Sequence, residues 1–323
     1  MSKRHSFDVT FKDDMINVSH LVKHFGALTA VDDVSFQVSK GEVLGFLGPN
    51  GAGKSTTMRM LTCFIPPSSG TATIGGFDIL NDSINARRQL GYLPENAPVY
   101  YDMTVEGYLG FIAEMRGCRG ADKTKKIENA IEMCALKNVR HQVIDTLSKG
   151  YKQRTCFAQA ILHDPPVLVL DEPTDGLDPN QKHEMRQMIK RMSENKCIIL
   201  STHILEEVDA VCSRAIIIAK GKVLANGTPA ELKARSQKHG TVVMRLKNVE
   251  EKEAIPYFGN VLNVYHVAAQ KIDNSLEIKV QPVQGKTIIA DVAAALRQKN
   301  WNIEQLNVEE GRLDEVFRII TKA

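Results

Sequence analysis

The sequence lacks the features that mark secreted, membrane-spanning or nucleic-acid-binding proteins. Its six cysteines are scattered with no C-x-x-C pair, so we interpret them as small buried residues of a reducing compartment rather than as disulfides or metal ligands. No apolar run approaches the ~18 residues of a membrane span, and we expect no signal peptide at the N-terminus. The net charge is only +3, and we expect no nucleic acid as a partner.

The strongest positive signal is a glycine-rich segment that fits the phosphate-loop pattern G-x-x-x-x-G-K-[ST] at every fixed position. An apolar stretch at 42–47 precedes it as a buried strand would, and 56–61 is typical of a helix start. This context disfavours the alternative of a glycine-rich turn with a chance lysine. We predict that Lys54 reaches the β- and γ-phosphates and that Ser55 holds Mg²⁺. The predicted phosphate-binding residues are Gly48, Pro49, Asn50, Gly51, Ala52, Gly53, Lys54, Ser55 and Thr56.

Two further apolar strands end in residues suited to nucleotide chemistry. The strand at 167–170 leads directly into Asp171 and Glu172, and ligands of open α/β sheets bind at such carboxyl ends. One carboxylate could arrange the water shell of Mg²⁺ while the other orients an attacking water. His203 follows the strand at 197–201 and could donate to a γ-phosphate oxygen. The alternative is an ordinary packed or surface histidine.

Two weaker candidates remain open from local sequence alone. Phe25 ends an edge strand at 15–25 and could either stack on a base or pack in the core below the turn. An apolar helix begins just after Ser148, Lys149 and Gly150, and its N-terminus is a possible second anion site. Taken alone, that helix start is only a capped helix.

The chain is long enough for two domains. We expect a flexible extension over 1–14, an α/β domain over 15–236 and a small α+β domain over 240–323. Within the first, residues from about 85 to 162 are predicted to form a helical insertion, broken near 117–120. The second has the order β-α-β-β-α-β and a final helix, which favours a ferredoxin-like module. It shows no catalytic constellation, so we expect regulation or dimer support.

In this order, the motifs of the first domain resemble those of the nucleotide-binding domain of ATP-binding cassette transporters. The set is far more specific than the phosphate loop alone. The resemblance implies a P-loop core with a mixed sheet, antiparallel edge strands and an inserted helical subdomain. It identifies 147–151 as the signature, 167–172 as Walker B and 176–178 as the D-loop, which adds Asp178 to the expected nucleotide-binding residues. It also implies that Phe25 stacks on adenine and that His203 is the switch histidine.

Three positions depart from the common form of that family. Lys149 stands where glycine is usual, Tyr151 where glutamine is usual, and Glu95 where the family has a glutamine that ligates Mg²⁺. These departures look typical of one branch, the ATPases of bacterial export systems that include gliding-motility and multidrug exporters. We expect Glu95 to join Ser55 and Asp171 as a metal ligand, because a carboxylate is a hard oxygen donor. The alternative is that Glu95 points away from the metal and pairs with a basic residue of the permease.

The resemblance also implies a mechanism and partners. Two cassettes form a head-to-tail sandwich, with each ATP between the Walker A loop of one and the signature of the other. The chain would therefore need a second copy or a homologous ATPase, and a separately encoded membrane permease at the cytoplasmic face of the inner membrane. Glu172 would polarise the water, while His203 and Lys54 would stabilise charge on the γ-phosphoryl group. The alternatives are an ATPase that acts without a permease and a nucleotide-binding scaffold that does not turn over.

Overall fold

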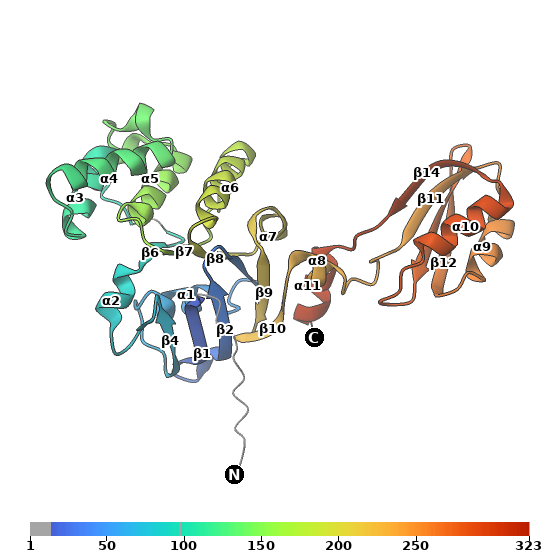
Figure 1. Ribbon diagram of the computed structural model, residues 1–323, viewed down its shortest axis with the longest axis horizontal. Coiled ribbons are helices and arrows are strands. Elements are labelled where there is room, and N and C mark those ends of the chain that lie inside the picture. Colours follow the sequence, from blue (N-terminus) through green and yellow to red (C-terminus); the bar gives the residue numbers. More distant parts are fainter. Residues whose placement is uncertain (1–13, 97, 323) are drawn as a thin grey trace, which may run out of the picture. The chain divides into compact units, whose positions relative to one another are not determined.

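A computed structural model describes residues 14–96 and 98–322 and divides into two compact units, Met1–Asn226 and Gly227–Ala323 (Figure 1). The division falls before the predicted domain end at 236, because α8 (Pro229–Lys233) packs against the C-terminal helix α11 (Leu313–Lys322). The extension expected over 1–14 lies outside the described residues except for Asp14, which begins strand β1 instead.

A six-stranded sheet forms the centre of the first unit, in the order β10-β9-β3-β8-β7-β6. The pairs β9-β3, β3-β8, β8-β7 and β7-β6 are parallel. Every residue of β3, β7 and β8 is buried, as expected for strands covered on both faces. The strand bounds are β3 (Val43–Leu47), β6 (Leu90–Leu93), β7 (Val167–Asp171), β8 (Cys197–Thr202), β9 (Arg214–Ala219) and β10 (Lys222–Gly227).

A second, antiparallel sheet of the first unit has the order β2-β1-β4-β5. Its strands are β1 (Asp14–Phe25), β2 (Leu28–Ser39), β4 (Ser69–Ile74) and β5 (Phe77–Asp78). Its apolar side chains share one core with the parallel sheet and with α1 (Lys54–Leu61). Phe36 of β2 and Phe46 of β3 join the sheets, with ring centroids 5.5 Å apart.

Three helices of the insertion gather to one side of the parallel sheet (Figure 1), α3 (Val105–Met115), α4 (Gly120–Met133) and α5 (Lys149–Ile161). Helix α2 (Ser83–Arg88) lies apart from these three and packs against β4, β5 and β6. Gly117, between α3 and α4, and Gly120, the first residue of α4, have φ of 82° and 54°, where glycine carries the least steric cost. Two further helices, α6 (Pro179–Ser193) and α7 (Leu205–Val211), follow β7 and β8.

The second unit is a ferredoxin-like module. Its sheet order, β12-β13-β11-β14, is antiparallel at every pair, and its helices α9 and α10 contribute apolar side chains to one core. Trp301 packs there against Tyr257 and Phe258, with centroids 5.3 and 5.6 Å away. The bounds are β11 (Val242–Lys247), α9 (Glu251–Gly259), β12 (Val264–Ile272), β13 (Ser275–Pro282), α10 (Ile289–Lys299) and β14 (Asn302–Val308).

Two absences bear on the expectations from the sequence. Of the helices in the described ranges, none combines the length and the apolar character needed to cross a bilayer. All six cysteine thiols are free. Burial raises the pKa of Cys134 and of Cys156 to about 12, so these thiols are protonated at neutral pH and behave as small apolar groups.

Candidate nucleotide-binding site

A cavity of about 920 Å³ in the first unit opens where β3, β7 and β8 end. It collects most of the residues that the sequence singled out. The residues that line it are Phe25, Leu28, Thr29, Ala30, Asn50, Gly51, Ala52, Gly53, Lys54, Ser55, Thr56, Glu95, Glu172, Asp175, His203, Lys220 and Gly221.

The loop between β3 and α1 depends on glycine for two separate reasons. Gly51 and Gly53 have φ of 76° and 104°, a region that residues with a Cβ rarely adopt. Gly48 has no such angle, but a Cβ there would lie 2.4 Å from the Ile218 carbonyl oxygen of β9. The loop therefore keeps its backbone close to the sheet and leaves its amides at the start of α1, where an anion is favoured.

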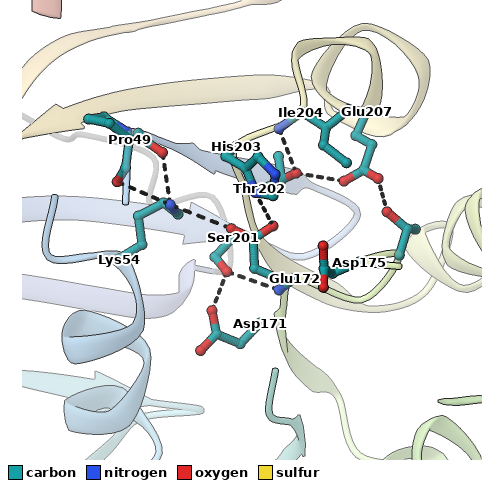
Figure 2. Close-up of polar contacts among 12 residues, drawn as sticks. Pro49, Lys54, Asp171, Glu172, Asp175, Ser201, Thr202, His203, Ile204 and Glu207 are labelled. Carbon is teal, nitrogen blue, oxygen red and sulfur yellow. Dashed lines mark hydrogen bonds and ion pairs between the residues drawn. The ribbon is translucent and has the colours of Figure 1, made fainter. Parts of the chain in front are cut away.

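Lys54 is held inside this loop. Its side chain is 6% exposed, and its Nζ donates to the carbonyl oxygens of Gly48 at 2.8 Å and Pro49 at 3.3 Å. The same Nζ lies 3.5 Å from Oε1 of Glu172 (Figure 2). The ammonium group is thus pre-positioned at the cavity wall.

Asp171 ends β7 beside two hydroxyl groups. Ser55 Oγ donates to Asp171 Oδ1 at 3.2 Å, and Ser201 Oγ donates to the same oxygen. Asp171 is 1% exposed. A serine hydroxyl next to a carboxylate is a donor set of the hard oxygen type that Mg²⁺ prefers, so the residues present fit that ion.

Glu172 lies between two cationic or proton-donating groups. Its Oε1 lies near Lys54 Nζ, as described above. Its Oε2 accepts a hydrogen bond from His203 Nδ1 at 2.9 Å (Figure 2). The Glu172 backbone has φ of 49°, and its N–H donates to Ser201 Oγ at 3.2 Å. Glu172 is 7% exposed, whereas the His203 side chain is 44% exposed. The carboxylate is therefore fixed while the imidazole faces the open side.

Phe25 and Glu95 both lie on the cavity wall. Phe25 is 49% exposed at the end of β1, which does not fit the alternative of a core aromatic. Lys23 Nζ lies 5.3 Å from the centroid of its ring. The Glu95 side chain is exposed. The pKa of the nearby Tyr92 is raised to about 12, first by burial and second by the charge of Asp171, and the charge of Glu95 adds to this effect.

The signature residues lie elsewhere on the unit. Ser148 caps α5 and accepts from the Tyr151 N–H at 3.4 Å. Lys149 Nζ is 3.9 Å from Asp175 Oδ2, and Asp178 caps α6. The signature residues, Asp178, Gly48 and Pro49 are not among the described residues that line the cavity, and neither is the buried Asp171.

Comparison with known proteins supplies the family. A family model described as ABC transporter matches residues 31–175. The Bacillus subtilis protein named uncharacterized ABC transporter ATP-binding protein YxlF is 32% identical over 314 residues, which cover 96% of this chain and all of that one. The chain belongs to the ABC transporter family. It is similar to the ATP-binding proteins of that family, which bind ATP.

Two further matches concern the cassette alone. The Escherichia coli protein named probable multidrug ABC transporter ATP-binding protein YbhF is 39% identical over 233 residues, 72% of this chain, which spans only 40% of that relative. A solved structure titled as an ATP binding subunit of an ABC transporter matches with a TM-score of 0.62 at 30% identity. That match covers 68% of this chain and 92% of the other.

Sequence reasoning missed two parts of this ABC cassette. Ser201 contacts both Asp171 and the Glu172 backbone, and a signal for it existed. It is the second-last residue of β8, which pairs with β7, and it lies directly opposite Asp171 in the parallel register. Glu207 of α7 is 1% exposed, and the repeated glutamates at 206 and 207 do not reveal which one is buried.

Proposed function

We propose that this chain hydrolyses ATP and that the hydrolysis powers a separately encoded membrane permease in the export direction. One observation supports it most. The Glu172 carboxylate is held on the wall of the cavity between Lys54 Nζ, at 3.5 Å, and His203 Nδ1, at 2.9 Å. This arrangement combines a base with two groups that can stabilise charge on a phosphoryl group. The multidrug name of YbhF supports the export direction.

The residues of the cavity divide the work of binding. Lys54 and the loop amides would hold the phosphates, and Phe25 would stack on the adenine. Ser55 and Glu95 of the cavity lining, with Asp171 beside Ser55, would hold Mg²⁺, and bound Mg²⁺ would neutralise part of the phosphate charge. We therefore expect ATP to bind to this site as its complex with Mg²⁺.

The same residues then act on the bond that is broken. Glu172 would accept a hydrogen bond from the attacking water and align it with the γ-phosphorus. His203 would donate a hydrogen bond to a γ-phosphoryl oxygen. The Lys54 ammonium group would stabilise the negative charge that develops on that phosphoryl group.

The second half of the site would come from another molecule. We propose that Ser148, Lys149, Gly150 and Asp178 of a second copy, or of a homologous ATPase, close the cavity in a head-to-tail dimer. Their position outside the cavity of their own chain supports this assignment. The dimer would sit on a permease at the cytoplasmic face of the inner membrane.

Glu172→Gln tests the proposal. We expect ATP affinity close to that of the wild type and a loss of turnover of about 10² or more, the range for removal of a group that acts in the transition state. Lys54→Ala should instead weaken ATP binding itself, because it deletes the charge that faces the phosphates. Exposed Glu194→Gln on the surface next to α6 is the matched control.

Phosphate release and nucleotide titration are the measurements. Wild-type turnover in Glu172→Gln would remove that residue from the role, and a wild-type protein that binds ATP without releasing phosphate would favour the scaffold. Co-purification with a membrane protein supports the permease, whereas full ATPase activity without any such partner supports an ATPase that acts alone.

A further inference from the structure

Glu207 is a buried carboxylate that has no role in the mechanism above. It lies in the first turn of α7 and is 1% exposed, whereas its neighbour Glu206 is exposed. Burial raises the pKa of Glu207, since loss of solvent disfavours the charged form. A carboxylate in such a place is tolerated only where it has partners.

The partners come from three separate segments. Thr202 Oγ1 of β8 donates to Glu207 Oε2 at 2.7 Å (Figure 2). Thr174 Oγ1 donates to Glu207 Oε1, and Arg186 Nη2 of α6 lies 3.8 Å from the same oxygen. Thr174 is 2% exposed and Thr202 is fully buried. Both carboxylate oxygens are therefore occupied away from water. We call Glu207, Thr174 and Thr202 the threonine clamp.

On one side, the clamp reaches the loop of the catalytic glutamate. Thr174 lies in a tight turn in which the Asp175 N–H donates to the Glu172 carbonyl at 3.1 Å and the Leu177 N–H donates to the Thr174 carbonyl at 3.2 Å. Glu172 has φ of 49°. A non-glycine residue keeps such a backbone only where its surroundings hold it firmly.

On the other side, the clamp reaches the histidine loop. Thr202 directly precedes His203, and its Oγ1 accepts from the Ile204 N–H at 3.0 Å. The hydroxyl thus links Glu207 to the backbone that follows the histidine. Glu207 does not line the cavity, so any effect it has on the reaction must pass through the two threonines.

We propose that Glu207 is a positioning residue that ties the loop of Glu172 to the loop of His203 and so sets the distance between the two side chains for ATP hydrolysis. The inference rests on the proposed function. It assigns Glu207 no contact with nucleotide, water or metal.

Glu207→Gln tests it, with Glu206→Gln as the matched control. An amide offers a single acceptor oxygen, so one threonine hydroxyl loses its acceptor. We expect kcat to fall about tenfold or more, equivalent to ~1.4 kcal/mol or more in the barrier. The KM for ATP should stay within about twofold, because the phosphate-binding loop is not part of the clamp. Glu206→Gln should match the wild type.

A second pair of variants applies even where Glu207→Gln does not fold. Thr202→Val removes the hydroxyl while keeping a branched side chain, and Thr202→Ser keeps the hydroxyl. We expect Thr202→Val to lose kcat as Glu207→Gln does and Thr202→Ser to retain most of it. The double variant Glu207→Gln/Thr202→Val should lose less than the two single losses combined, because the two residues are in direct contact and their effects are not independent.

Each outcome bears on one proposal. Unchanged kcat in Glu207→Gln and Thr202→Val, with an active wild type, overturns the clamp and leaves the proposed function standing. Parallel losses of kcat, ATP affinity and melting temperature also overturn it, because they show a stability effect alone.

A wild type that releases no phosphate overturns the proposed function. In that case amide hydrogen exchange tests whether the threonine clamp holds the two loops. Faster exchange at the amides of 172–177 and 202–204 in Glu207→Gln than in Glu206→Gln supports it. Equal exchange overturns it.

Discussion

We expect His163 to make the first unit sensitive to acid. The ring follows α5, and its Nε2–H donates to the Leu90 carbonyl oxygen at 3.1 Å. Its Nδ1 is buried, and no group among residues 14–96 and 98–322 forms a hydrogen bond with it. Burial, with the positive charge of Arg116 as the second cause, lowers the pKa of His163 from 6.5 to about 4. Protonation would therefore add an N–H donor at Nδ1, where no acceptor of the described residues is within hydrogen-bond distance.

The direction of the pH effect follows from proton binding. Because the pKa of His163 is lower in the folded state, its contribution to stability is complete above about pH 6.5 and is lost as the pH falls toward 4. Between pH 7.5 and pH 5.0, linkage gives a loss of about 2 kcal/mol in the free energy of unfolding. Since the ring is only partly covered, we expect about 1–2 kcal/mol.

Urea unfolding at the two pH values, followed by circular dichroism, measures this loss. His163→Gln keeps a donor for the Leu90 carbonyl but does not titrate, and His183→Gln on the exposed face of α6 is the matched control. We expect the wild type and His183→Gln to lose more stability than His163→Gln. Fluorescence of Trp301, the single tryptophan and a residue of the second unit, should be the same in all three. An equal loss in His163→Gln would refute the reasoning.

Three other changes have definite expected results. Glu95→Gln should make ATP affinity depend less steeply on Mg²⁺, because a carboxylate attracts the cation and repels bare phosphate. ATP titration of both proteins with and without Mg²⁺ measures this dependence. An identical dependence in the two proteins would exclude Glu95 as a ligand. Gly91→Ala should cost about 3 kcal/mol or more, because a Cβ there would lie 2.0 Å from the Ala160 carbonyl oxygen; an unchanged melting temperature would contradict this. A fragment of residues 1–226 should bind ATP and aggregate less than one of 1–240, which exposes Leu232, buried in the whole chain; light scattering compares them.

The residues proposed for nucleotide chemistry could be picked out from the sequence because each stands next to a clear strand or helix signal. Lys54 and Ser55 open a helix after a glycine loop, and Asp171 and Glu172 follow an apolar strand directly. Parallel strands present their carboxyl ends at one edge, so the sequence order already indicates that these side chains meet. The structure then supplies the partners, such as the contact between Ser55 and Asp171 at 3.2 Å.

The boundary between the units could not be read in the same way. Residues 232–240 are polar and aperiodic, which is typical of a linker. Ser236 is nevertheless 2% exposed, because its Oγ donates to Glu315 Oε2 at 2.6 Å. That partner lies near the other end of the unit's sequence, and local periodicity carries no information about contacts of that range. Glu207 escaped notice for the same reason, since its partners Thr174 and Thr202 lie on other elements.

The position of Glu172 explains why it needs support beyond its ionic partners. Lys54 Nζ at 3.5 Å and His203 Nδ1 at 2.9 Å are the groups that the proposed mechanism directs toward phosphate. At an effective dielectric constant of about 20, a charge pair at that first distance corresponds to roughly 5 kcal/mol of Coulomb attraction, and phosphate oxygens compete for it. In that mechanism Lys54 and His203 would turn to the nucleotide, and Glu172 would become free to accept from water. Its place must then be kept by contacts that phosphate cannot reach. The Ser201 hydroxyl on its backbone N–H and the buried threonine clamp are contacts of that kind.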